Sequence, residues 1–197
     1  MGIFLVALSE LAGGCGLKTE NKLLDGFALF TDGSVEPRSG MGVGAYLLVR
    51  LEEFTLEPEE LKSQQFRERV KTHVFENTSS TRLEVETALW AIKEYQKILQ
   101  DLDKRPFRPL QLYSDSQCVS GLLGRRNKLE ANQFCSKKTK KPLRNADLYR
   151  IFYHLFDQMY FEVVKVTGHT KSRERTNIDT LFVHVDRTAR RTLQGLL

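Results

Sequence analysis

Four acidic residues stand at the boundaries of predicted secondary-structure elements, where their side chains could share a site. Asp32 follows the apolar run 27–30 in LFTDGS, and Asp115 follows the strand-like segment LQLYS. Both acids therefore lie at carboxyl ends of predicted strands, where the ligands of mixed sheets gather. Clustered carboxylates raise one another's pKa unless cations intervene, and Mg²⁺ or Mn²⁺ bound through oxygen is the usual solution. The four candidate ligands are Asp32, Glu84, Asp115 and Asp179.

Each of these acids also has a purely structural explanation. Asp32 precedes a glycine, and Asp-Gly is a strong turn signal. Glu84 can form a capping box with Thr81, which satisfies backbone donors without any catalysis. Asp115 can cap the helix after it, and Asp179 can favour the positive end of the last helix. Taken by themselves, the residue types leave both interpretations open.

Hydrophobic periodicity predicts the elements that position these acids. Apolar runs and alternating patterns predict strands over 26–32, 42–50, 70–77, 110–115 and 160–169. Apolar stripes predict helices over 81–99, 116–123, 145–159 and 177–193, and Pro58 followed by two glutamates marks a short surface helix. A three-stranded meander followed by strand–helix–strand units indicates an α/β fold, with a five-stranded mixed sheet flanked by helices.

The composition fits one globular domain in a reducing compartment. The chain has 197 residues, of which 41% are hydrophobic and 28% charged, enough for a single buried core. Its three cysteines form no C-x-x-C pair, which argues against a disulfide framework or zinc site and favours a cytoplasmic location. No apolar stretch approaches the roughly 20 residues that a membrane helix needs.

The charge of the chain favours an anionic partner, with nucleic acid first. The formal net charge is +5, and the segment 124–144 has a local charge of +7, with Glu130 as its one acid. A solvated surface is the plain explanation of such a run. Its position between two helices instead suggests contact with duplex phosphates and salt-dependent binding. The basic residues are Arg125, Arg126, Lys128, Lys137, Lys138, Lys140, Lys141 and Arg144.

Several separated segments, taken in order, resemble ribonuclease H of type 1. They are LFTDGS, STRLEVETALWAI, LQLYSDSQCV and VTGHTKSRERTNIDTL, and KKPLRNADLYRIF looks like the segment after the family's basic protrusion. The resemblance covers about residues 26–193, most of the chain. It implies an RNase H-like catalytic domain at 26–197, with an insert at 50–70 and a basic protrusion at 124–144. Residues 1–25 are expected to form a leader or a peripheral segment.

The resemblance implies a metal-dependent endonuclease. Asp32, Glu84, Asp115 and Asp179 would bind two Mg²⁺ ions, or Mn²⁺, and the RNA strand of an RNA–DNA hybrid would be cut to leave a 3′-hydroxyl and a 5′-phosphate. Two cations about 3.5–4 Å apart can activate water and stabilise the leaving oxygen. His169, in Gly-His followed ten residues later by an acid, matches the family's loop histidine and would assist proton transfer or product release.

The same resemblance gives candidate contacts to the hybrid duplex. Gly33 and Ser34 match the motif that reads the minor groove, where 2′-hydroxyls identify RNA. Ser80 and Thr81 stand where the family commonly has two asparagines, and a hydroxyl donates one hydrogen bond rather than two. Discrimination of hybrids from other duplexes is therefore left open. No protein partner or membrane is implied, and a monomer is expected.

Two other functions stay open at this point. The same fold could act on a different duplex, as in resolvases, transposases or domains of reverse-transcribing elements. A binding module without catalysis would be expected if a metal ligand were missing, but the sequence has all four acids.

Overall fold

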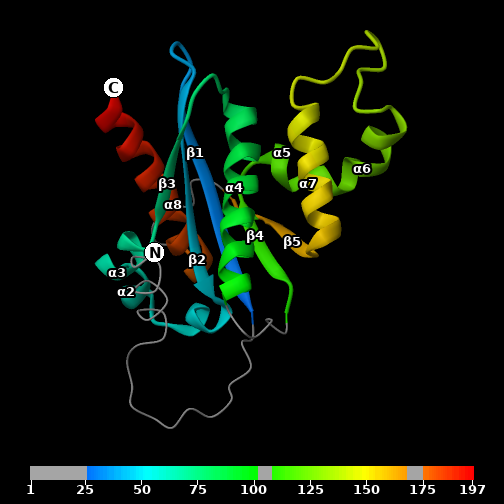
Figure 1. Cartoon of the computed structure of the whole chain (residues 1–197). Helices are drawn as coiled ribbons and strands as arrows, with labels where there is room; N and C mark the ends of the chain where they lie inside the picture. Colours follow the sequence, from blue (N-terminus) through cyan, green and yellow to red (C-terminus); the bar gives the residue numbers. More distant parts are fainter. Residues whose placement is uncertain (1–25, 102–107, 168–174) are drawn as a thin grey trace.

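The computed structural model describes residues 26–101, 108–167 and 175–197 and places the elements in the predicted order (Figure 1). The strands are β1 (Phe27–Glu36), β2 (Met41–Arg50), β3 (Lys71–Phe75), β4 (Leu110–Ser114) and β5 (Phe161–Lys165). The helices are η1 (Leu51–Thr55), α2 (Pro58–Leu61), α3 (Gln64–Glu68), α4 (Ser80–Asp101), α5 (Gln117–Ser120), α6 (Leu122–Ala131), α7 (Ala146–Gln158) and α8 (Asn177–Leu196). Within those ranges no helix combines the length and the hydrophobicity needed to cross a bilayer.

The five strands form one mixed sheet in the order β3-β2-β1-β4-β5, which confirms the predicted fold class. The β1–β2–β3 meander is antiparallel, whereas β4 pairs parallel with both β1 and β5. The pairing of β1 with β4 ends at Phe30 and Tyr113, but β1 continues to Glu36 along β2. Asp32 therefore lies within a strand, paired with Ala45, and not at the strand tip that its sequence position suggested. It stands just beyond the point where β1 loses its neighbour β4.

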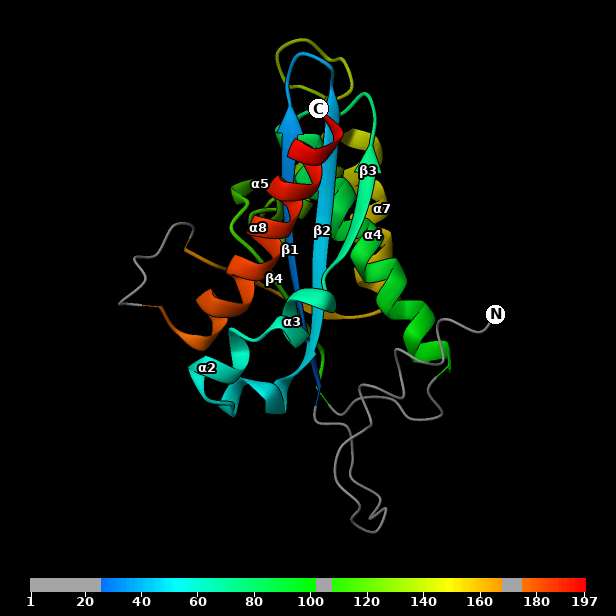
Figure 2. The same ribbon diagram turned by 90° about the vertical axis from the view of Figure 1, so that its left-hand side faces the viewer.

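Helices cover both faces of the sheet. Helices α4, α5 and α7 pack on one face around a core that includes Leu29, Ile92 and Phe152. Helix α8 packs on the other face over a second core that includes Phe30, Leu47 and α8's own apolar side chains. Figure 2 shows α8 and α4 on opposite sides of the strands. The sheet is therefore the middle layer of three, and acids from either helical layer can reach the same strand.

Glycines in the β1–β2 hairpin allow α4 to lie close to the sheet. A Cβ on Gly33 would stand 2.8 Å from Leu83 Cδ2, and a Cβ on Gly44, its partner across the hairpin, would collide with Thr87 Oγ1. Leu83 and Thr87 are one helical turn apart on α4, so both rest on this side-chain-free patch. The close approach brings Glu84, the neighbour of Leu83, toward β1.

The predicted insert at 50–70 forms η1, α2 and α3, and this segment packs against α8. The Asn177 side chain donates hydrogen bonds to the carbonyl oxygens of Phe54 (2.8 Å) and Leu56 (3.0 Å). Almost two turns further along α8, His184 Nε2 lies 2.6 Å from the Leu61 carbonyl oxygen. Burial lowers the pKa of His184, so the neutral ring donates this bond. The insert thus holds α8 at two points against its face of the sheet.

Candidate active site

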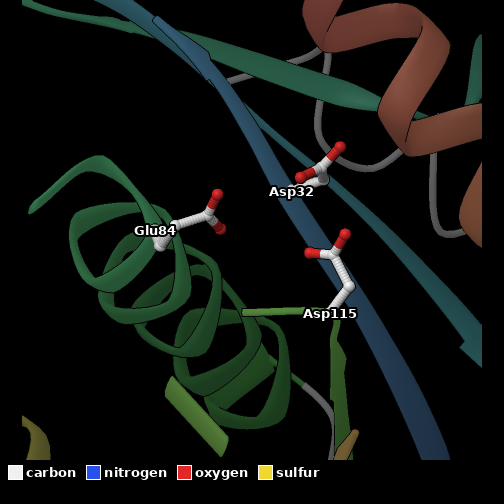
Figure 3. A group of neighbouring side chains, drawn as sticks. All are labelled: Asp32, Glu84 and Asp115. Atoms are coloured by element: carbon white, nitrogen blue, oxygen red, sulfur yellow. The ribbon is translucent and has the colours of Figure 1, made fainter. Parts of the chain in front are cut away.

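Three acids from three separate elements meet beside β1. Asp32 comes from β1, Glu84 from the first turns of α4, and Asp115 from the residue after β4. One carboxylate oxygen of each can be chosen so that all three lie within 4.8 Å of one another. Figure 3 shows the three side chains converging at β1, with Glu84 reaching toward the two aspartates from α4. Strand β4 ends at Ser114, so the chain turns away there and leaves Asp115 facing the exposed flank of β1.

The helix start excludes a capping role for Glu84. Helix α4 begins at Ser80, one residue before Thr81, so Thr81 lies inside the first turn and does not cap the helix. The capping-box explanation of Glu84 therefore does not describe the structure. Glu84 is half-buried and faces the two aspartates.

The electrostatics of this cluster favour a bound cation. Asp32 is only 7% exposed, and burial, with the neighbouring Asp115 as the next cause, raises its pKa from 3.8 to about 8. A backbone hydrogen bond from Gly33 opposes this rise. Burial, then Asp32 and Asp115, raises the pKa of Glu84 from 4.5 to about 9. Three acids so placed cannot all ionise without positive charge between them, and a purely oxygen donor set suits Mg²⁺ or Mn²⁺.

The structure does not bring the fourth predicted ligand, Asp179, into this group. Its carboxylate caps α8 instead, since Asp179 Oδ2 lies 2.8 Å from both the backbone nitrogen and Oγ1 of Thr176. Two turns further along α8, the side chain of Asp186 lies within hydrogen-bonding reach of Asp32 and contributes to the raised pKa of Asp32. The fourth acid beside the cluster is therefore Asp186, which the sequence analysis missed.

The prediction of Asp179 rests on its spacing of ten residues from His169, taken from the family resemblance, and helical periodicity does not correct it. Seven residues turn an α-helix by almost two full turns, so Asp179 and Asp186 lie on nearly the same face, about 10 Å apart along the axis. Periodicity selects the face but not the level. The sequence did contain a signal, because Thr176-x-x-Asp179 is a capping-box pattern that assigns Asp179 to the helix end.

Other predicted site residues are placed as follows. Gly33 and Ser34 lie half-buried in β1 just after Asp32. Gly33 packs against the side chain of Leu83 on α4. Ser80 and Thr81 are exposed at the start of α4, on the side of the cluster. The predicted loop histidine, His169, lies outside the described residues.

The basic residues predicted for duplex contact fall into two groups. Arg126 pairs with Glu130 (2.8 Å) and with Asp157 (2.5 Å), and Arg125 donates to the backbone oxygens of Gly121 and Cys118. These two arginines therefore hold α6 in place. The others are exposed and form no ion pair with any described residue: Lys128, Lys137, Lys138, Lys140, Lys141 and Arg144.

The segment after α6 forms a short loop that presents these lysines. A bridge between Cys135 and Pro142 closes it, and the buried Phe134 anchors it between Tyr153 and the guanidinium of Arg150. The loop projects from the α6–α7 side of the molecule (Figure 1).

Comparison with known proteins identifies the family of this arrangement. A sequence model of the RNase H family matches residues 25–190. No curated protein sequence is similar enough to give a significant match.

Solved RNase H structures share the fold at low sequence identity. The solution structure of the RNase H domain of prototype foamy virus is 13% identical, with a TM-score of 0.58, and the match covers 87% of this chain and 95% of that one. RNase H1 from the halophilic archaeon Halobacterium salinarum is also 13% identical, with a TM-score of 0.54, over 86% and 98% of the two chains. A foamy viral protease-reverse transcriptase in complex with dsDNA is 12% identical, with a TM-score of 0.53, over 85% and 95%.

Proposed function

We propose that this chain, which belongs to the RNase H family, hydrolyses the RNA strand of RNA–DNA hybrids with the help of two divalent metal ions. The observation that carries the proposal is the convergence of Asp32, Glu84 and Asp115 beside β1, joined by Asp186 from α8. These four carboxylates would hold Mg²⁺ or Mn²⁺. Such a pair of cations supplies an activated water and stabilises the leaving 3′-oxygen, so the products are a 5′-phosphate and a 3′-hydroxyl.

The protein's own part in this reaction is to hold charge and position. Burial and mutual repulsion leave Asp32 and Glu84 poorly compensated in the metal-free protein, so cation binding relieves an existing electrostatic cost. The strand β1 and the first turns of α4 are fixed by the glycine contacts, which keeps the donor oxygens in place. His169 is proposed to carry a proton near the scissile phosphate or to aid product release.

The substrate is proposed to lie across the start of α4 and the basic loop. Ser34, Ser80 and Thr81 offer hydroxyls to the minor groove, where the 2′-hydroxyls of RNA are displayed. The exposed lysines between Lys137 and Lys141 would contact phosphates of the duplex and make binding salt-dependent.

A second candidate keeps the nuclease activity but relaxes its preference for hybrids. It is supported by Ser80 and Thr81, which donate fewer hydrogen bonds than the amides usual in this family. A related solved structure was obtained with dsDNA bound.

Cleavage of an end-labelled RNA–DNA hybrid in Mg²⁺ tests the proposal, beside RNA duplex, DNA duplex and single-stranded RNA. The wild type should cut the RNA of the hybrid, and both Asp115→Asn and addition of a chelator should abolish cutting. Cutting of the other duplexes would favour the relaxed candidate. Binding of hybrid without any cutting would make the chain a binding module.

A further inference from the structure

A cavity of about 360 Å³ opens beside the acid cluster on the α8 side of the sheet. Asp115 and Asp186 line one part of it, which makes it continuous with the acid cluster. The rest of its lining includes a row of long polar side chains from the C-terminal half of α8. These are Arg187, Arg190, Arg191 and Gln194.

The length of this row matches several nucleotides of one strand. Arg187 and Gln194 are seven residues apart, so the row extends about 10 Å along the helix axis. A nucleic-acid strand rises about 3.4 Å per phosphate, so the row can face roughly three consecutive phosphates.

Two of the three arginines of the row have no counter-charge among the residues that the structure describes. Arg190 pairs with Asp186 at 2.7 Å, one turn before it. Arg187 and Arg191 are exposed, and neither forms an ion pair with a residue of the described ranges. Two like charges one turn apart destabilise a helix by about 0.2–0.5 kcal/mol, so the spacing of these arginines does not stabilise α8.

We infer that the arginine row binds phosphates of the strand that is being cut, within about three nucleotides of the scissile phosphate. Guanidinium groups suit this ligand because their planar fork donates two hydrogen bonds to one phosphate. The row lies on the face of the sheet opposite to the lysine loop of α6 and α7 (Figure 1). The acid cluster is thus flanked by two cationic surfaces, and the arginine row is the one that adjoins Asp115 and Asp186. The inference rests on the proposed function for the identity of the strand, but not for the binding itself.

The test compares the double variant Arg187→Gln/Arg191→Gln with a matched control. Lys71→Gln/Lys93→Gln removes the same charge from exposed positions of β3 and α4, and neither lysine forms an ion pair with a described residue. Hybrid binding is measured on an Asp115→Asn background, which separates affinity from cleavage, between about 50 and 200 mM salt. Steady-state cleavage is measured with Asp115 intact. Thermal unfolding of each variant checks that it is folded.

Loss of two phosphate contacts should reduce the slope of log K against log salt by about 1.8. Over this fourfold range of salt, wild-type affinity should fall about tenfold more than that of the double variant. At low salt KM should rise while kcat is retained, and the control should behave as wild type. Arg187→Lys/Arg191→Lys, which keeps the charge, should restore most of the slope.

An unchanged slope in the double variant, or an equal change in the control, would overturn the inference. The cleavage arm reports on the proposed function separately. If the wild type leaves hybrids uncut but the slope falls as expected, the phosphate site stands and the proposed reaction does not.

Discussion

Replacing Asp186 and Asp179 one at a time by asparagine separates the two candidates for the fourth carboxylate. Asparagine has nearly the shape of aspartate but no charge. Asp186 reaches Asp32, whereas Asp179 caps the first turn of α8. Asp186→Asn should therefore lower kcat by roughly 10²–10³-fold, the loss that follows removal of one electrostatic stabiliser from a reacting centre. Asp179→Asn should change activity by no more than about twofold, as for a substitution outside such a centre.

The two variants should differ in the opposite sense in stability. Asp179 supplies a negative charge at the helix N-terminus and accepts bonds from the backbone nitrogen and hydroxyl of Thr176 at 2.8 Å. Losing that charge costs about 0.3–1 kcal/mol and lowers Tm by about 1–4 °C. At about pH 9, where Asp32 is charged, Asp186→Asn removes a repulsion with Asp32 and also a partly exposed ion pair with Arg190, worth about 0.3–0.5 kcal/mol. These effects oppose each other, so metal-free Tm should stay the same or rise.

The assay measures initial rates on an end-labelled hybrid in Mg²⁺ and thermal unfolding without divalent metal. The expected pattern is a crossed one, in which Asp186→Asn is inactive and stable while Asp179→Asn is active and less stable. An inactive Asp179→Asn beside an active Asp186→Asn would refute the reasoning. It would mean that α8 meets the cluster two turns earlier than the structure places it.

Four further predictions concern the metal site and the packing of α4 on the sheet. Divalent-metal binding should strengthen from pH 6 to pH 9 and should release protons. The reason is that the raised pKa values of Asp32 (about 8) and Glu84 (about 9) leave protons on these carboxylates, which the metal must displace. Calorimetry in buffers of different ionisation enthalpy measures the number of protons released. Protonation of Asp32 stabilises the metal-free folded protein; this contribution is complete below about pH 4 and is lost as pH rises through about 8. Asp32→Asn, which cannot become charged, should therefore raise the metal-free Tm more at pH 9 than at pH 6. A lack of proton release, or an equal rise at both pH values, would contradict this account. Gly44→Ala should lower the free energy of unfolding by about 1–3 kcal/mol and should lower kcat. The new methyl group would collide with Thr87 and displace α4, which carries Glu84. A variant with wild-type Tm and kcat would count against the glycine contact. Thr87→Val should raise Tm by about 2–4 °C, because the buried Thr87 hydroxyl finds no hydrogen-bond partner among the described residues; a lower Tm would indicate a partner for that hydroxyl.

The sequence predicted the fold and three of the four acids for identifiable reasons. Strand and helix periodicity predicted the order of elements, and the meander followed by strand–helix–strand units predicted a mixed sheet. The parallel pairing of β1 with β4 was not itself predicted. Asp32 and Asp115 were expected to converge because both were predicted at the carboxyl ends of strands, although β1 continues past Asp32 in the structure. Glu84 was identified by the family resemblance, since the residue types alone left its capping-box explanation open.

The parts that sequence did not give depend on contacts between distant segments. The local sequence does not indicate that β1 extends beyond the end of β4, because the length of β1 depends on how far β2 pairs with β1. The level of α8 relative to β1 is set by the bonds of Asn177 and His184 to the insert, more than 120 residues away along the chain. A pattern with a period of 3.6 residues cannot report that level, so Asp179 and Asp186 were not distinguishable by face alone.

The position of α8 along its axis, relative to β1, determines the placement of two features, because this helix carries both the fourth acid and the arginine row. Asp186 and Arg190 are one turn apart and paired, so moving α8 by a turn would displace the acid and its neighbouring cations together. The insert bonds at Asn177 and His184 lie on the N-terminal side of both features. Their backbone acceptors belong to one continuous segment between β2 and β3, which is itself fixed to the sheet by the strands at its two ends. The insert is thus a structural reason why α8 presents Asp186, rather than the acid two turns before it, to the strand that carries Asp32.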